Sequence, residues 1–302
     1  MDLIAAEGIE KRFGQLTALR DISLRVRRGE LYGLIGPDGA GKTTFFRILT
    51  TLMPPDGGRA TVDGLDIATD YRRIRAAVGY MPGRFSLYPD LTVKENLEFF
   101  ATLFGTRLED NYDLIRDIYV QIEPFRSRRA GRLSGGMKQK LALCCALIHR
   151  PRVLFLDEPT TGVDVVSRHE FWDMLSGLKR QGITMLVSTP YMDEAVRCDR
   201  IALIQSGRLL SIDTPGGIIE NYPDALFEVR AENMRQLTDE IRKRCSPQSC
   251  FAFGRSLHVS FSRDDAEAPQ RMRVALTAAG CTNLEIAPIT PSIEDCFIQQ
   301  MR

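Results

Sequence analysis

Short apolar runs alternate with stretches of helical spacing over the first two hundred residues. Residues 3–10 and 19–26 read as short strands. Residues 31–35, 153–156 and 183–188 are dominated by apolar side chains, which is typical of strands buried inside a parallel sheet. Apolar strands joined by helices predict an α/β fold whose core is a parallel or mixed sheet.

Helical spacing of apolar residues links these runs. The predicted helices are 42–52, 91–125, 134–149 and 167–180, and residues 59–67 are strand-like. The helix from residue 134 begins at a serine-glycine turn, and the helix from residue 167 is ended by Gly182.

The pattern changes near residues 221–223, which read Asn-Tyr-Pro. Beyond them the predicted order is strand, helix, two strands, helix and strand, at 225–231, 234–244, 250–254, 256–262, 266–279 and 282–288, with a last helix at 292–301. This order is typical of a small ferredoxin-like α+β domain. We therefore expect two domains, 1–220 and 221–302.

Composition excludes several classes of protein. The 302 residues are 44% hydrophobic and 26% charged with a net charge of +1, values that fit a globular chain and give no reason to expect a nucleic-acid partner. The longest apolar run, residues 141–148, is far shorter than the roughly 20 residues of a membrane span, so any membrane association is expected to run through a partner. Seven irregularly spaced cysteines indicate reduced, buried thiols in the cytosol.

A glycine-rich loop follows the apolar run 31–35. Residues 36–43 read GPDGAGKT and fit the phosphate-loop pattern G-x-x-x-x-G-K-[ST] between a strand and a helix. Backbone N–H groups of such a loop converge on phosphate oxygens, Lys42 reaches the outer phosphates, and the Thr43 hydroxyl can bind Mg²⁺. The candidate nucleotide-binding residues are Gly36, Asp38, Gly39, Ala40, Gly41, Lys42, Thr43 and Thr44.

A pair of acids ends the apolar run 153–156. Parallel sheets place their ligands at the carboxyl ends of their strands, where Asp157 and Glu158 stand. Asp157 is predicted to hold Mg²⁺, and Glu158 is the candidate catalytic residue that polarises the attacking water. A solvated Asp-Glu turn is the alternative, and the phosphate loop argues against it.

Residues 133–139, LSGGMKQ, lie between these motifs. The order of phosphate loop, LSGG, apolar strand with Asp-Glu, and PTTGVD at 159–164 resembles the ATP-binding-cassette (ABC) ATPases over residues 1–220. The resemblance implies a P-loop NTPase fold with a helical subdomain at 85–150, and a head-to-tail dimer with two ATP molecules between its subunits. Ser134, Gly135 and Gly136 would then offer donors to the nucleotide of the partner cassette.

Two further residues match the family. Phe13 resembles the aromatic residue that stacks on adenine, and its alternative is a place in the core. Asp164 resembles the loop aspartate that crosses the dimer interface, and its alternative, which does not exclude the first role, is to cap the helix that follows.

Two positions depart from the family pattern. Gly83 stands where a glutamine usually follows the Gly-Tyr-x-Pro stretch, and Pro190 replaces the usual histidine that contacts the γ-phosphate. Proline offers no side-chain donor and no N–H. Our hypothesis is an asymmetric dimer in which this chain holds the slow site and lends its signature to a partner's fast site. The rival is a homodimer that hydrolyses ATP slowly with Glu158 alone.

Two segments resemble parts of export systems. Residues 85–97 are similar to the segment that docks the coupling helix of a permease, with Phe85, Leu87 and Tyr88 as apolar contacts; burial in the helical subdomain is the alternative. Residues 291–297 resemble the ending of cassette subunits from bacterial drug and antibiotic exporters, whose C-terminal extensions serve dimer contact or regulation.

The resemblance implies an ATP-hydrolysing subunit of a multidrug or antibiotic exporter. ATP and Mg²⁺ are the expected cofactors. The expected partners are an integral-membrane permease and a second cassette, which is either another copy or a paralogue. The chain is expected to be cytoplasmic and peripheral on the inner face of the membrane. Alternatives are a non-hydrolysing ATP-sensing regulatory cassette, favoured by Gly83 and Pro190, and a soluble cassette outside transport.

Overall fold

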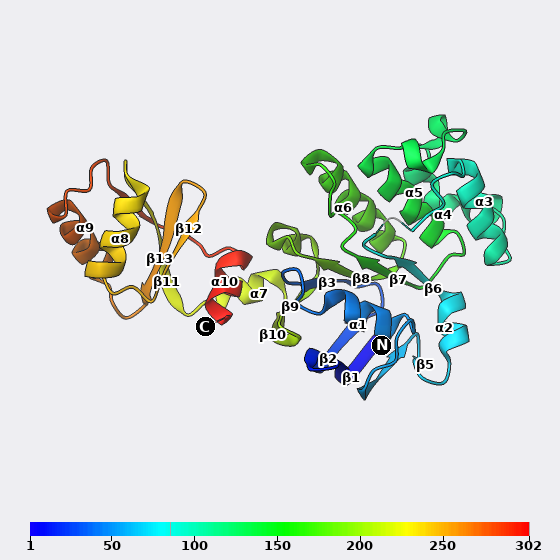
Figure 1. Ribbon diagram of the computed structural model, residues 1–302, viewed down its shortest axis with the longest axis horizontal. Helices are drawn as coiled ribbons and strands as arrows, with labels where there is room; N and C mark the ends of the chain where they lie inside the picture. Colours follow the sequence, from blue (N-terminus) through cyan, green and yellow to red (C-terminus); the bar gives the residue numbers. More distant parts are fainter. Residues whose placement is uncertain (85, 302) are drawn as a thin grey trace. The chain divides into compact units, whose positions relative to one another are not determined.

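A computed structural model describes residues 1–84 and 86–301 of the chain (Figure 1). The chain divides into two compact units, Met1–Pro215 and Gly216–Arg302. The division lies at Pro215, before the expected boundary at residue 220, because the short helix α7 (Pro215–Glu220) belongs almost entirely to the second unit. No helix among the described residues is both long and apolar enough to cross a bilayer.

The centre of the first unit is a six-stranded sheet in the order β10-β9-β3-β8-β7-β6. Its strands are β3 (Leu31–Ile35), β6 (Val78–Met81), β7 (Val153–Asp157), β8 (Thr184–Thr189), β9 (Arg200–Gln205) and β10 (Arg208–Asp213). All neighbours are parallel except β9 and β10, which form a hairpin. The three apolar runs form β3, β7 and β8, every residue of which is buried, so the predicted α/β core is confirmed.

A second, antiparallel sheet has the order β2-β1-β4-β5. Its strands are β1 (Asp2–Phe13), β2 (Leu16–Arg27), β4 (Gly57–Val62) and β5 (Leu65–Asp66). The single strand predicted at 59–67 is wrong, because Asp63 and Gly64 both adopt positive φ and turn the chain into a hairpin.

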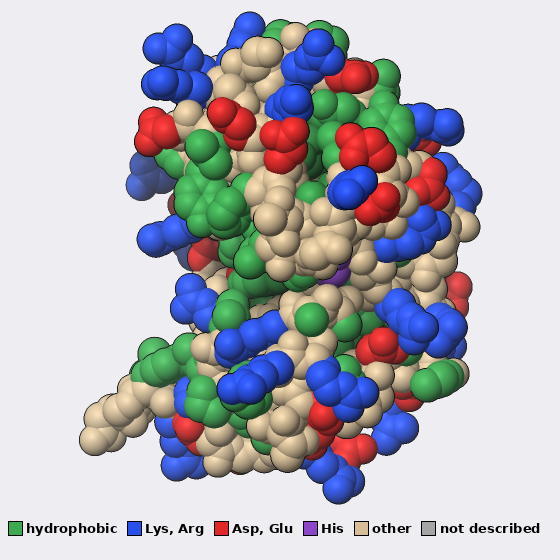
Figure 2. All heavy atoms as spheres, turned by 90° about the vertical axis from the view of Figure 1, so that its right-hand side faces the viewer, with side chains coloured by type: hydrophobic (Ala, Val, Ile, Leu, Met, Phe, Trp, Pro, Cys, Tyr) green, Lys and Arg blue, Asp and Glu red, His purple; other side chains and the backbone are tan. Residues whose placement is uncertain are grey.

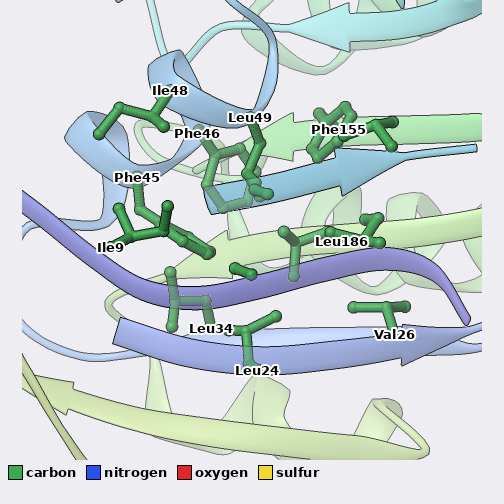
Figure 3. Packing of buried hydrophobic residues seen from close by; sticks show 14 of the residues in the cluster. Ile9, Leu24, Val26, Leu34, Phe45, Phe46, Ile48, Leu49, Phe155 and Leu186 are labelled. Carbon is green, nitrogen blue, oxygen red and sulfur yellow. The ribbon is translucent and has the colours of Figure 1, made fainter. Parts of the chain in front are cut away.

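Helix α1 (Lys42–Leu49) packs between the two sheets. Figure 3 shows Phe45, Phe46 and Leu49 directed into the cluster that holds Ile9 of β1 and Phe155 of β7. The Phe46 and Phe155 rings meet edge to face, with their centroids 6.0 Å apart. The helix therefore anchors the end of the phosphate loop in the core of the unit. It ends at Leu49, before the predicted residue 52, because Thr51 has a φ of +61°.

The remaining helices of the first unit flank the six-stranded sheet. They are α2 (Tyr71–Ala77), α3 (Val93–Leu103), α4 (Tyr112–Tyr119), α5 (Gly135–Leu147) and α6 (Val165–Arg180), with 3₁₀ turns η1 (Glu109–Asn111), η2 (Glu123–Phe125), η3 (Ala130–Arg132) and η4 (Met192–Arg197). Figure 1 shows α3, α4 and α5 grouped beside the β6 end of the sheet. The continuous helix predicted over 91–125 is wrong: Gly105, at positive φ, ends α3 and a loop separates it from α4.

The second unit carries an antiparallel sheet in the order β12-β13-β11-β14. Its elements are β11 (Asp224–Arg230), α8 (Met234–Arg244), β12 (Ser249–Phe253), β13 (Ser256–Ser262), α9 (Ala268–Ala278), β14 (Glu285–Pro288) and α10 (Ile293–Gln300). This chain order and strand order are those of a split βαβ arrangement.

The seven cysteines are all free thiols; five are buried, and Cys245 and Cys281 are half-buried.

Candidate functional site

The phosphate loop runs from the end of β3 to the first turn of α1. Gly41 has a φ of +107°, and a Cβ placed there would lie 2.7 Å from the carbonyl oxygen of Ala18 in β2. Only glycine fits this position, because another side chain would clash with the backbone and strain the turn. The loop is therefore fixed from both sides, by β3 within the sheet and by β2 behind it.

Lys42 is the first residue of α1 and is only 3% exposed. Its ammonium donates to the carbonyl oxygens of Gly36 at 2.7 Å and Pro37 at 2.9 Å, and it lies 3.1 Å from Oε1 of Glu158. A buried cation needs such partners, since an unpaired charge in the interior is costly. The lysine of the phosphate loop and the acid after β7 are thus brought together, although they are far apart in the sequence.

Asp157 ends β7 and is 1% exposed. Ser188 of β8 donates its hydroxyl to Oδ1 of Asp157 at 2.7 Å. Burial raises the pKa of Asp157, and hydrogen bonds from Ser188 and Thr43 act in the opposite direction. A carboxylate beside a threonine hydroxyl is an oxygen donor set that suits Mg²⁺ bound together with phosphate.

Glu158 adopts a left-handed backbone with a φ of +50°. Its N–H lies 3.1 Å from the carbonyl oxygen and 3.0 Å from the hydroxyl oxygen of Ser188, so β8 holds this turn in place. A non-glycine residue in this conformation costs free energy, and such strain is often found at functional sites. The side chain is directed toward Lys42, as expected of a group that acts at the phosphate end of a nucleotide.

A cavity of about 400 Å³ opens beside the phosphate loop, a volume within the usual range for small-molecule sites. It is lined by Phe13, Leu16, Thr17, Ala18, Arg20, Gly39, Gly41, Lys42, Thr43, Thr44, Glu158 and Ser206. Phe13 is 46% exposed, so the alternative of a core phenylalanine is wrong. The cavity therefore has an aromatic wall at one end and the lysine and glutamate at the other.

The turn between β9 and β10 is not among the elements or site residues that the sequence predicts. Gly207 donates its N–H to the carbonyl oxygen of Ala40 at 2.9 Å, and its own carbonyl oxygen accepts from the N–H of Arg20 at 2.8 Å. Its φ is +74°, and a Cβ there would lie 2.4 Å from the carbonyl oxygen of Ala18. The Ser206–Gly207 dipeptide, a common turn signal, could have indicated the hairpin but not its contact with the phosphate loop.

The residues of the LSGG segment lie elsewhere. Ser134 caps α5 by accepting from the N–H of Met137 at 3.3 Å. Asp164 caps α6 by accepting from the N–H and the hydroxyl of Ser167, at 3.0 and 2.7 Å, so its capping role is present. A Cβ on Gly136 would lie 2.7 Å from Oγ of Ser167, which places the starts of α5 and α6 against each other. None of Ser134, Gly135, Gly136 and Asp164 lines the cavity that contains Lys42.

Comparisons with known proteins agree with this geometry. Residues 19–161 match the family described as ABC transporter. The chain is 36% identical over 299 residues to the Nod factor export ATP-binding protein I of Burkholderia lata, covering 96% of this chain and 94% of that protein. The chain belongs to the ABC transporter family. Its sequence resemblance to ABC ATPases is thereby confirmed.

This ABC cassette is also similar to a second relative and to a solved structure. It is 37% identical over 302 residues to the "Probable multidrug ABC transporter ATP-binding protein YbhF" of Escherichia coli, covering 98% of this chain but only 51% of that protein. The chain thus spans about half the length of this relative. A solved dimeric bacterial ABC transporter cassette, MJ0796, is 25% identical with a TM-score of 0.63, covering 70% of this chain and 98% of that one.

The two positions at which this ABC cassette departs from the usual pattern lie close to the site. A Cβ on Gly83 would lie 3.0 Å from the carbonyl oxygen of Asp157, so the position borders the acid pair. Pro190 directly follows Thr189, the last residue of β8. The next side chain, Tyr191, stacks on Arg168 of α6, with the guanidinium carbon 3.9 Å from the centre of the tyrosine ring.

The expected docking segment of this ABC cassette is partly buried. Leu87 is buried, whereas Tyr88 is 47% exposed and meets Phe99 edge to face with ring centroids 4.8 Å apart; Phe85 lies outside the described residues. An apolar cavity of about 160 Å³, the size of cavities that hold a small apolar group, lies beside Leu87 between the sheet and α3 and α5. Figure 2 shows the side of the molecule that lies at the right in Figure 1, and hydrophobic side chains line a hollow across its middle.

Proposed function

We propose that this chain binds ATP and Mg²⁺ in the cavity beside the phosphate loop and hydrolyses ATP to drive a membrane exporter. The observation that carries the proposal is the convergence of Lys42 and Glu158, 3.1 Å apart, on a cavity whose far wall is the half-exposed ring of Phe13. An aromatic surface suits a nucleobase, and a lysine at a helix N-terminus suits phosphates.

Each polar group then has a distinct task. Lys42 neutralises charge on the outer phosphates, and the loop amides hold the remaining oxygens. Thr43 and Asp157 would hold Mg²⁺, which supplies charge neutralisation at the phosphates when bound. Glu158 accepts the proton of the attacking water. Ser188 holds the backbone of Glu158 and the side chain of Asp157 in place for this purpose.

A second cassette completes the site in this proposal. Ser134, Gly135, Gly136 and Asp164 do not line the cavity of their own chain, which supports a role toward the nucleotide of another subunit. The start of α5, a helix of 13 residues, offers N–H donors and the positive end of its dipole to a γ-phosphate. A related solved cassette is described as dimeric, which supports the pairing of two cassettes.

The names of the relatives support export as the process. They include a Nod factor export protein and a multidrug transporter protein, and both are named ATP-binding proteins. We propose that a separate permease binds the first unit at the inner face of the membrane. We also propose that the second unit, which contains the predicted domain 221–302, has an accessory role in regulation or dimer contact. Glu158 opposes the alternative of a non-hydrolysing sensor, because its position beside Lys42 is that of a general base.

The proposal is tested with purified chain, alone and mixed with a second cassette encoded beside it. We expect ATP with Mg²⁺ to raise the molar mass measured by light scattering to that of a cassette pair, and hydrolysis to release it. Fast hydrolysis by the chain alone would overturn the asymmetric arrangement. Absence of ATP-driven pairing with itself or with any second cassette would overturn the dimer.

Replacing Phe13 by alanine should weaken nucleotide binding about tenfold, because base–aromatic stacking is worth about 1–3 kcal/mol per base. Phe13→Tyr keeps the ring and should retain the affinity. Titration with a fluorescent ATP analogue measures both variants. Equal affinities for Phe13→Ala and the unaltered chain would show that adenine does not stack on this ring.

Pro190→His should raise the rate of ATP hydrolysis about tenfold or more, because a donor aimed at developing charge is typically worth about 10²–10³ in rate. The matched control is Pro190→Ala, which removes the proline without adding a donor and should leave the rate low. Steady-state phosphate release measures all three proteins. A Pro190→Ala rate equal to that of Pro190→His would assign the slow turnover to the rigidity of proline instead.

A further inference from the structure

Glu194 is a buried carboxylate for which the proposed reaction has no direct use. It lies in η4 and is 3% exposed. Its Oε2 accepts from the hydroxyls of Thr160 at 3.1 Å and Thr189 at 2.5 Å, and its Oε1 accepts from Nε of Arg168 at 3.0 Å. Both threonines are themselves buried. Every contact of this carboxylate is therefore with a different segment of the first unit.

The three partners of Glu194 lie next to residues of the candidate site. Thr189 follows Ser188, the residue that bonds both acids of the site. Thr160 is two residues beyond Glu158, and the next residue, Thr161, donates its N–H back to the carbonyl oxygen of Glu158 at 3.2 Å. Arg168 is in the first turn of α6, the helix that Asp164 caps. One carboxylate thus joins the end of β8, the turn after Glu158 and the start of α6.

The contacts continue from the start of α6 to the LSGG segment. Ser167, next to Arg168, bonds Asp164 and lies against Gly136, where a Cβ would be 2.7 Å from its hydroxyl oxygen. A Cβ on Gly135 would lie 3.5 Å from the carbonyl oxygen of Gly162, which precedes Asp164 in the chain. Residues 158–168 comprise the turn after β7 and the first turn of α6, and we call them the 158–168 loop. A continuous path of contacts therefore leads from Glu158 through this loop to the N-terminus of α5.

A buried ion pair of this kind contributes to geometry more than to stability. Removing two charges from water offsets much of their attraction, so such pairs are weak evidence for a stabilising role. Arg168 also lies 3.2 Å from Asp193 and stacks on Tyr191, so its guanidinium is held in one orientation. The arrangement fixes the 158–168 loop against η4, the segment that follows Pro190.

We propose that Glu194 is a positioning residue that couples Glu158 of this chain to the LSGG segment that the chain offers to its partner. This inference rests on the proposed function, because the reaction that Glu194 would affect is the proposed hydrolysis of ATP. The Glu194 carboxylate holds the 158–168 loop, so that a displacement of the Glu158 turn is transmitted to the start of α5. Through this loop, the state of one ATP site affects the donors supplied to the other.

The test uses Glu194→Gln, which keeps the shape of the side chain and removes its charge. We expect kcat for ATP hydrolysis to fall at least about tenfold, while KM for ATP stays within about twofold, because the cavity itself is untouched. Arg168→Gln should have the same effect, because it removes the cation that faces Glu194. The matched control is Asp173→Asn, which breaks the exposed pair of Asp173 and Arg197 between the same helix and η4 and should leave kcat unchanged.

Hydrogen exchange without nucleotide gives an independent readout. In Glu194→Gln the amides of Thr161, Val163, Ser167 and Met137 should exchange faster, while the amide of Phe45, which bonds Gly41 in the phosphate loop, should not change. If the unaltered chain did not hydrolyse ATP, the proposed function would fail and this exchange pattern would still decide the role of Glu194. Unchanged exchange and unchanged kcat, or an equal loss in Asp173→Asn, would overturn the inference.

Discussion

Lys42→Ala is expected to reduce ATP binding by at least about a hundredfold and to abolish hydrolysis, since removing one partner of a buried charge pair at a binding interface costs about 2–5 kcal/mol and the lost cation is the proposed phosphate ligand. The structure gives three reasons for so large an effect. The ammonium bonds the carbonyl oxygens of Gly36 and Pro37, which shapes the loop, and it neutralises Glu158. Alanine removes all three interactions and leaves the Glu158 carboxylate beside a phosphate with no cation between them.

Isothermal titration with ATP and Mg²⁺ measures the effect of Lys42→Ala. The control is Lys179→Ala, which breaks the partly exposed pair of Lys179 and Asp199 and should leave the affinity unchanged. Circular dichroism shows whether both variants keep their helices. Equal ATP affinity in folded Lys42→Ala and in the unaltered chain would be incompatible with nucleotide binding at this loop.

Glu158→Gln is expected to slow hydrolysis about 10²–10⁴-fold, the usual contribution of a general base, while ATP remains bound. Glutamine has the same size, and the backbone bonds of residue 158 to Ser188 do not depend on the side chain, so the strained turn should persist. The charge opposite Lys42 is removed, which leaves the ammonium free for phosphate. The ATP-bound pair of cassettes should therefore accumulate rather than dissociate.

Single-turnover hydrolysis and light scattering in the presence of ATP measure the two effects of Glu158→Gln. Glu170→Gln is the matched control, because Glu170 lies on α6 and pairs with Lys140 away from the cavity. A Glu158→Gln rate equal to that of Glu170→Gln would mean that the acid after β7 serves only to neutralise Lys42.

Local pattern predicted the elements that need few distant partners to form. The apolar runs at β3, β7 and β8 and the loop before α1 depend on composition over five to eight residues, and the sequence alone indicated their type. Helix α8 and strand β13 begin and end at the predicted residues 234–244 and 256–262. The hairpin β9–β10 and helix α2 are not among the predicted elements, and the single helix predicted over 91–125 contains both α3 and α4.

The sequence by itself determined which groups the proposed function can use: a phosphate loop, an acid pair after a buried strand, an LSGG segment, and the absence of the usual donors at Gly83 and Pro190. These are properties of neighbouring residues, which is why a linear pattern contains them.

The tertiary structure alone decided which of these groups meet. It brings Lys42 to Glu158, supports Ala40 through Gly207, exposes Phe13 at the cavity, and joins Thr160 to Glu194. The pairwise contacts join residues that are separated by 34 to 167 positions, and the exposure of Phe13 depends on the packing of a whole surface. Such contacts follow from the order of strands in the sheet and from packing, and local residue preferences do not encode either.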